Sequence, residues 1–315
     1  MFDRGYDAQV RLLLRCLPEI NRHLCFALKG GTAINLFVRN LPRISVDIDL
    51  TYLPLKPRRE VLQDVHDKLI SIKHDIEQRV PGSRIREGRS QDYVVKLLVS
   101  TDDATVKVEP NLILRGSVHT SQNRDLCVAA QEYFETFVSV QTLSMADLYG
   151  GKLCAALDRQ HPRDLFDVKL LLDDTGITAQ IRRAFVVYLA GHSRPMNELL
   201  APRLQDIGAL YVDQFTGMTR SEVSLNELLR LQRNLAKTLL RALDDDEKEF
   251  LVSVKRGEPK LGPPGNRAFG PASGHSMEAH QHPQDGLSQA QGSARPIDRG
   301  PGDVNAAQVI SQPGS

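Results

Sequence analysis

The stretch Arg43-Ile44-Ser45-Val46-Asp47-Ile48-Asp49-Leu50 follows Pro42 and predicts a strand over residues 46–50. Side chains on a strand point alternately to its two faces, so Asp47 and Asp49 project together while Val46, Ile48 and Leu50 face a core. Two adjacent carboxylates repel each other, and a cation relieves that repulsion. Oxygen ligands on a rigid element suit Mg²⁺, which commonly also holds substrate phosphates. The alternative is a solvent-facing edge strand.

Upstream of this strand, Gly30-Gly31-Thr32 lies between an apolar run at 24–28, read as a strand, and a helical pattern at 32–38. Glycines let backbone N–H groups approach a phosphate closely, and a helix N-terminus favours negative charge there. The stretch is therefore a candidate phosphate cradle, although a glycine pair at such a turn is also ordinary structural punctuation.

Downstream, Glu109 ends a β-rich run over 105–109 in which Val106 and Val108 share one face and Lys107 and Glu109 the other. A carboxylate on a neighbouring strand could complete a metal site begun by Asp47 and Asp49. Taken alone, the Lys/Glu alternation is also typical of a solvated face.

A fourth candidate group occupies a helical pattern near residues 152–167. Lys152 and Arg159 are seven residues apart and share a helix face, and both side chains bind phosphates. Asp164 and Asp167 share a face at i,i+3, and Arg163 precedes them. The alternative is a salt-bridged helix pair formed by Arg159, Arg163, Asp164 and Asp167. Gly150-Gly151 weakens a helix by about 1 kcal/mol per glycine, which predicts a helix start or hinge near Lys152.

These four features together describe one reaction class. Phosphoryl or nucleotidyl transfer needs a metal to polarise the phosphates, cations to hold the triphosphate, and an oxygen nucleophile. A glycine turn, a paired-Asp strand, a later strand carboxylate and a Lys-Arg helix supply these parts in order.

Composition fits a folded protein with a separate tail. The chain has 315 residues, of which 41% are hydrophobic and 25% charged. We expect mixed α/β structure over 1–143, with a helix at 57–80 and β-rich runs at 93–99, 105–109 and 137–140, and only helices over 144–255. Residues 256–315 hold eight of the 17 prolines and ten of the 22 glycines, which predicts disorder. The fold class is therefore α+β.

Charge and targeting features narrow the function classes. A net charge of +1 argues against a general nucleic-acid coat, so any RNA contact must come from a local patch. The run Arg79, Arg84, Arg86 and Arg89, with Lys56, Arg58 and Arg59, could be that patch or a solvated face. No apolar run reaches a membrane span, no signal peptide is evident and the four cysteines form no CxxC pair. We expect a cytoplasmic protein with no membrane or DNA partner.

Three stretches together resemble the AbiEii/AbiGii nucleotidyltransferase toxin family, which includes the MenT toxins and belongs to the polymerase-β-like superfamily. They are Leu28-Lys29-Gly30-Gly31-Thr32-Ala33, the strand segment 43–50, and Lys152–Arg159 with Arg163-Asp164-Leu165-Phe166-Asp167. The resemblance covers about residues 10–175, in the family's order and with compatible spacing.

The resemblance implies a bilobed enzyme with a mixed-sheet catalytic core and a helical C-terminal lobe. It further implies an Mg²⁺-dependent transferase, with Mn²⁺ as a possible substitute, that uses an NTP, adds nucleotides to the tRNA 3′ end and is blocked by a cognate antitoxin. By position, Gly30, Gly31 and Thr32 would cradle phosphates, Ser45 would help seat the nucleotide, and Asp47, Asp49 and Glu109 would hold metal. Lys152 and Arg159 would bind the triphosphate, Asp164 would be the late catalytic acid, and Arg163 and Asp167 would support the site.

Two alternatives stay open. The acceptor could be a protein or small-molecule hydroxyl instead of tRNA. The protein could also be a catalytically inactive nucleotide-binding regulator, whose expected signature is loss of Asp47, Asp49 or Lys152; all three are present.

Overall fold

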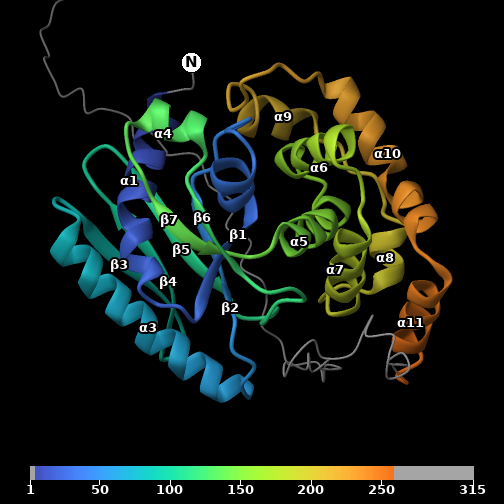
Figure 1. Ribbon diagram of the computed structural model, residues 1–315, viewed down its shortest axis with the longest axis horizontal. Coiled ribbons are helices and arrows are strands. Elements are labelled where there is room, and N and C mark those ends of the chain that lie inside the picture. Colours follow the sequence, from blue (N-terminus) through green and yellow to red (C-terminus); the bar gives the residue numbers. More distant parts are fainter. Residues whose placement is uncertain (1–3, 259–315) are drawn as a thin grey trace, which may run out of the picture. The chain divides into compact units, whose positions relative to one another are not determined.

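The computed structural model describes residues 4–258, which form a seven-stranded mixed sheet followed by a group of helices (Figure 1). This confirms the predicted α+β class. Most of the predicted disordered tail lies outside the described residues. Within the described part, no helix combines the length and apolarity that crossing a membrane requires.

The strand order is β3-β4-β5-β2-β1-β7-β6. The middle of the sheet is formed by β1 (Phe26–Lys29), β2 (Asp47–Tyr52) and β5 (Thr105–Asn111). Strand β2 runs antiparallel to β1 and parallel to β5. Outside them lie β3 (Arg84–Ser90), β4 (Tyr93–Ser100), β6 (Gln122–Asp125) and β7 (Ser139–Thr142). The acidic strand thus lies at the centre of the sheet and is no edge strand.

The two faces of β2 have different neighbours. Ile48, Leu50 and Tyr52 are buried, and the Tyr52 hydroxyl donates a hydrogen bond to Asp64 of α3 (Arg58–Arg79). Helix α3 and the N-terminal helix α1 (Arg4–Asn21) pack together on this side of the sheet (Figure 1). By strand alternation, Asp47 and Asp49 point to the opposite face.

On that opposite face the chain turns from β1 directly into a helical segment. One turn, α2 (Gly30–Thr32), continues into η1 (Ala33–Val38), whose hydrogen bonds follow the rarer π pattern. Such π segments occur frequently at functional sites. The helix predicted over 32–38 is therefore present with a wider turn. A further short helix, α4 (Val128–Phe134), lies between β6 and β7 in the sequence.

Beyond β7 the described chain is almost wholly helical. The helices are α5 (Met145–Asp158), α6 (Pro162–Asp174), α7 (Ala179–Ala190), α8 (Met196–Leu200), α9 (Gly208–Gln214), α10 (Leu225–Ala242) and α11 (Asp245–Lys255). Side-chain caps begin several of them, with capping boxes at Ser224 and Asp244. The predicted change from mixed structure to helix near residue 144 is confirmed.

Two local predictions need correction. Strands β3 and β6 were not expected, since their sequences, RIREGRS and QNRD, lack apolar alternation. Gly150 and Gly151 mark no helix start or hinge, because α5 runs unbroken through both. A Cβ at Gly150 would come within 2.8 Å of the Ala184 backbone, so this glycine lets α5 approach α7 closely.

Candidate active site

The paired carboxylates lie where three strands meet. In the sheet register, Asp47 is opposite Lys107 and Asp49 is opposite Glu109, and on the other side Lys29 of β1 is opposite Asp49. All five side chains are half-buried. The predicted association of Glu109 with the acidic pair is thus present at the level of strand register, and the sheet adds two lysines beside it.

The charges of this group perturb one another. Burial raises the pKa of the Asp49 carboxyl, and the charge of Asp47 acts in the same direction while Lys29 opposes it. Burial likewise lowers the pKa of Lys29, although Asp49 acts against that shift. Lys107 Nζ lies 2.8 Å from a carboxylate oxygen of Glu109. A bound cation would relieve the repulsion between such closely spaced, partly buried carboxylates.

The glycine turn fits tightly against the acidic strand. Gly30 has φ +75°, and a Cβ there would come within 2.6 Å of Asp49 Oδ2. A Cβ at Gly31 would meet Ser45 Oγ at 2.6 Å and an Arg43 guanidinium nitrogen at 2.7 Å. Only glycine allows this approach, so the backbone of the turn lies directly against Asp49 on one side and Ser45 on the other.

Thr32 and Ser45 connect the turn to the strand. The Thr32 hydroxyl donates to the backbone carbonyl of Asp47 at 2.5 Å and lies 3.2 Å from Ser45 Oγ. Both side chains are buried, Thr32 completely. These bonds hold the start of the helical segment against the residue that carries the first carboxylate.

A buried ion-pair network lies beneath the turn. Arg43 is 2% exposed and donates from two nitrogens to Asp167, at 2.8 and 2.6 Å. Asn35 donates to the carbonyl of Gly31 at 2.8 Å and to Asp167 at 3.1 Å. Burial alone would raise the pKa of Asp167, but Arg43 and Lys152 outweigh it and hold that pKa below its usual range. Helix α6 is thereby bound to the glycine turn through Asp167.

Lys152 and Arg159 converge on Asp164. Lys152 Nζ lies 2.8 Å from Asp164 and 3.0 Å from Asp167, and its side chain is 5% exposed. Arg159 donates two hydrogen bonds to Asp164, at 2.5 and 3.0 Å, and its side chain is 62% exposed. Burial opposes ionisation of Asp164, yet the two cations keep its pKa far below the usual range. The predicted salt-bridge interpretation therefore holds for Arg159 and Asp164, and Lys152 is enclosed between two acids.

Arg163 differs from its neighbours. Its guanidinium is half-buried, and among residues 4–258 it forms no ion pair. Burial lowers its pKa and Arg43 adds to that effect, whereas the charge of Asp47 acts in the opposite direction. Electrostatic coupling to Asp47 indicates that Arg163 lies near the acidic strand with its charge available.

Several members of this site were not assigned roles from sequence. They are Lys29, Asn35, Arg43 and Lys107, and of these Lys29 and Arg43 stand inside the motif stretches. A charged residue inside an apolar strand, as at Lys29 after Phe26-Ala27-Leu28, is the signal that could have indicated one of them.

The basic run proposed as an RNA patch is largely neutralised. Arg79 contacts Glu19 and Asp75, Arg84 contacts Asp102, Arg89 contacts Glu87 and Lys56 contacts Asp64. Ion pairing of this kind is typical of a solvated protein surface.

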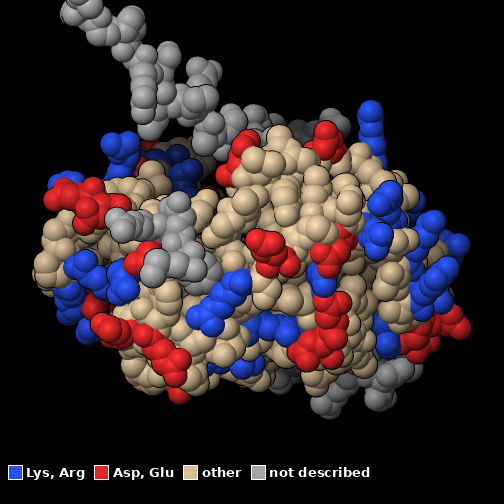
Figure 2. Space-filling view, turned by 90° about the horizontal axis from the view of Figure 1, so that it is seen from above, with Lys and Arg blue, Asp and Glu red and all other residues tan. Residues whose placement is uncertain are grey.

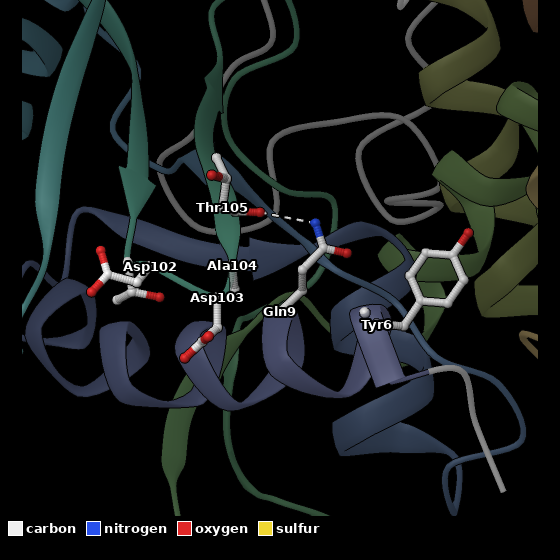
Figure 3. Close-up of a pocket in the computed structure, with 8 residues that line it drawn as sticks. Tyr6, Gln9, Asp102, Asp103, Ala104 and Thr105 are labelled. Atoms are coloured by element: carbon white, nitrogen blue, oxygen red, sulfur yellow. Dashed lines mark hydrogen bonds between the residues drawn. The ribbon is translucent and has the colours of Figure 1, made fainter. Parts of the chain in front are cut away.

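A separate depression lies between the start of α1 and the turn from β4 to β5 (Figure 3). Gln9 donates to the Thr105 carbonyl at 2.9 Å there, and Asp102 and Asp103 stand at its edge. Because Thr105 begins β5 and Glu109 lies near its end, the depression is distinct from the acidic site.

Comparison with known proteins agrees with this geometry. No curated protein matches the sequence. The fold is similar to that of MenT4, a nucleotidyltransferase toxin from Mycobacterium tuberculosis H37Rv, with a TM-score of 0.56 and 17% identity over 80% of this chain and 90% of the other. The model of the family described as "Nucleotidyl transferase AbiEii toxin, Type IV TA system" matches residues 11–272, well beyond the 10–175 of the motif resemblance. This chain therefore belongs to the AbiEii nucleotidyltransferase toxin family.

Proposed function

We propose that this toxin is an Mg²⁺-dependent nucleotidyltransferase that moves nucleotides from an NTP to RNA, with the tRNA 3′ end as acceptor. The observation that carries the proposal is the contact between the glycine turn and the acidic strand. Gly30 lies directly against the Asp49 carboxylate, and the Thr32 hydroxyl donates to the backbone carbonyl of Asp47, whose side chain shares the strand face of Asp49. That arrangement suits a triphosphate held between N–H donors and a divalent cation.

The donor set fits Mg²⁺ shared with a substrate. Among residues 4–258 no group of three or more His, Cys, Asp or Glu side chains is arranged to hold a metal. Mg²⁺ is commonly held by one or two carboxylates together with substrate phosphates, which is what Asp47 and Asp49 offer. When bound, the ion would polarise the phosphates and favour the ionised form of an attacking hydroxyl. Glu109, now paired with Lys107, is the third candidate ligand.

The cations around the carboxylates would neutralise the triphosphate. Arg159 is the most exposed of them, and its two bonds to Asp164 hold its guanidinium plane in a defined orientation. Arg163 and Lys29 lie close enough to the acidic strand for their pKa values to respond to it. Lys152 would contribute its charge from behind Asp164, because its ammonium is enclosed between two carboxylates.

Asp164 would act as a positioning residue in this scheme. Its depressed pKa keeps it ionised, so it accepts hydrogen bonds and has no proton to donate near neutral pH. The type IV toxin–antitoxin family implies an antitoxin as a cellular partner.

A label-transfer assay tests the proposal. The protein is incubated with Mg²⁺, one labelled NTP at a time and total tRNA, beside Asp47→Asn as the isosteric variant and Asp102→Asn as a surface control. We expect label in tRNA with the wild type and the surface control, and loss of both label and growth inhibition with Asp47→Asn. Label on the protein or on a small molecule would identify that molecule as the acceptor in place of tRNA. NTP binding without any transfer would favour a nucleotide-binding regulator.

A further inference from the structure

Helix α10 has two chemically opposite faces. Its buried face is formed by Leu228, Gln232, Leu235 and Leu239. Arg230, Arg233, Lys237 and Arg241 follow one another at spacings of three, four and four residues, so they lie on one face. All four are exposed, and helical geometry puts them opposite the buried face. These four residues are called the α10 basic face below.

The charges of the α10 basic face have little compensation within the described part of the chain. The helix contains one acidic residue, Glu227, whose pKa is lowered by hydrogen bonds from Ser224 and, in smaller part, by the charge of Arg230. None of the four side chains forms an ion pair within residues 4–258, and Arg233 only donates to the carbonyl of Leu229. From Leu228 to Ala242 the helix contains no acidic residue. Lys and Arg side chains gather along the right-hand side of Figure 2, the side on which Figure 1 places α10. This contrasts with the basic run at 79–89, where ion pairs absorb most of the charge.

Such an arrangement costs stability in the free protein. Like charges at i,i+4 on a helix destabilise it by about 0.2–0.5 kcal/mol per pair. From Arg230 to Arg241 the four cations span 11 residue steps, or about 16 Å at roughly 1.5 Å per step. A chain with a net charge of only +1 thus concentrates unpaired positive charge on one helix face. An extended anion would relieve this repulsion along the whole length.

The buried face connects α10 to the candidate active site. Gln232 donates to the Gln160 side chain at 2.7 Å and to the carbonyl of Gln205 at 2.9 Å. Gln160 has φ +50° and directly follows Arg159, the exposed cation bound to Asp164. Helix α10 therefore supports the turn that carries Arg159. A ligand on its outer face lies about one helix diameter, roughly 10 Å, from that turn.

We propose that the α10 basic face is the docking surface for the phosphodiester backbone of the RNA acceptor, an inference that rests on the proposed nucleotidyltransferase function. A regular row of Arg and Lys suits a regularly charged polymer. A protein partner fits less well, because the centres of protein interfaces are depleted of charged residues as a class, although Arg, which supplies three of these four side chains, is itself enriched there. Backbone contacts of this kind hold RNA in register without reading its sequence.

The test measures RNA binding separately from catalysis. Fluorescently labelled tRNA is titrated with full-length protein at several salt concentrations. The test variant is R230Q/R233Q/K237Q/R241Q. The matched control, R58Q/R59Q/R84Q/R86Q, removes the same charge from four other exposed arginines. Circular dichroism and thermal unfolding confirm that both variants are folded. We expect the α10 variant to bind at least tenfold more weakly and its log Kd–log salt slope to fall by about 3, at 0.7–0.9 per phosphate contact.

Any other result of the binding measurements would overturn the proposal. Equal loss in both variants would mean that bulk charge alone sets affinity, and unchanged binding in the α10 variant, or no binding by wild type, would remove the docking surface. An α10 variant that keeps tRNA but loses the antitoxin would assign the face to an acidic protein. Label transfer is measured in parallel, so tRNA binding through α10 without transfer would contradict the proposed function and leave the docking surface standing.

Discussion

The buried pair between Arg43 and Asp167 allows a quantitative test of the network beneath the glycine turn. In Asp167→Asn the side chain keeps its shape and loses its charge. Arg43 then keeps its bond to the carbonyl of Ile44 at 2.8 Å and one acceptor, the new amide oxygen, but it loses its carboxylate partner, whereas Lys152 keeps Asp164. The change therefore leaves one uncompensated charge at Arg43, which is 2% exposed.

The expected cost follows from that burial. Removing one partner of a buried ion pair destabilises a protein by about 3–5 kcal/mol. For a domain of this size, 1 kcal/mol shifts Tm by about 2–4 °C, which gives a decrease of roughly 6–20 °C. We also expect weaker NTP binding, because the Arg43 guanidinium lies directly under Gly31.

Differential scanning calorimetry and urea unfolding measure this cost. The control is Asp102→Asn, which breaks an ion pair with Arg84 whose partners are 87% and 69% exposed. An exposed pair contributes about 0–1 kcal/mol, so its Tm should change little. If the Tm of Asp167→Asn lies within about 2 °C of that of Asp102→Asn, the buried charge of Arg43 does not depend on Asp167 and the network does not stabilise the turn.

Three further predictions concern single positions. Gly31→Ala should abolish NTP binding, because its Cβ would overlap Ser45. Gly151→Ala, which has open space around it, should bind NTP normally and raise the free energy of unfolding by up to about 1 kcal/mol. Equal NTP affinities of the two variants would refute the phosphate cradle. Gly150→Ala should lower stability by about 1–3 kcal/mol by forcing α5 from α7, and a rise in its urea midpoint would contradict that packing. Burial lowers the folded-state pKa of His23, His161 and His192, so the unfolded chain binds more protons than the folded one at mildly acidic pH. The free energy of unfolding should therefore be full above about pH 6.5 and decline as the pH falls below that value. In urea unfolding, a variant with all three histidines changed to Gln should lose this pH dependence.

The features that sequence could predict are those set by local pattern. Alternation in 46–50 predicted the strand and the common face of Asp47 and Asp49, and the proline at 57 with its following periodicity predicted α3. Strands β3 and β6 escaped because their own residues carry no apolar alternation. They form by pairing with the edges of β4 and β7, which is a property of the partner strand.

Glycine illustrates the same limit. At Gly30 and Gly31 the strand-to-helix context predicted a close approach of a phosphate, which stays a prediction. The structure shows a close approach of a different kind, by the side chains of Asp49 and Ser45. At Gly150 the same logic predicted a hinge, but the reason for glycine is a contact with α7, whose backbone arrives from more than 30 residues later. A glycine inside a helix can serve packing or bending, and only the tertiary partner separates the two.

The cations show why roles are harder to predict than membership of a site. The motif placed Lys152 on the triphosphate, but two acids enclose it, and the exposed cation beside them is Arg159. Arg43 had no assigned role because its partner, Asp167, is 124 residues away. The role of a buried arginine can be predicted only when the carboxylate that compensates its charge is known. The row from Arg43 through Asp167, Lys152 and Asp164 to Arg159 alternates in charge, so that buried groups neutralise one another and only its last member keeps an exposed cationic surface. That alternation predicts that substitutions along the row act on substrate binding through Arg159 and the glycine turn, the two ends at which the row reaches the site.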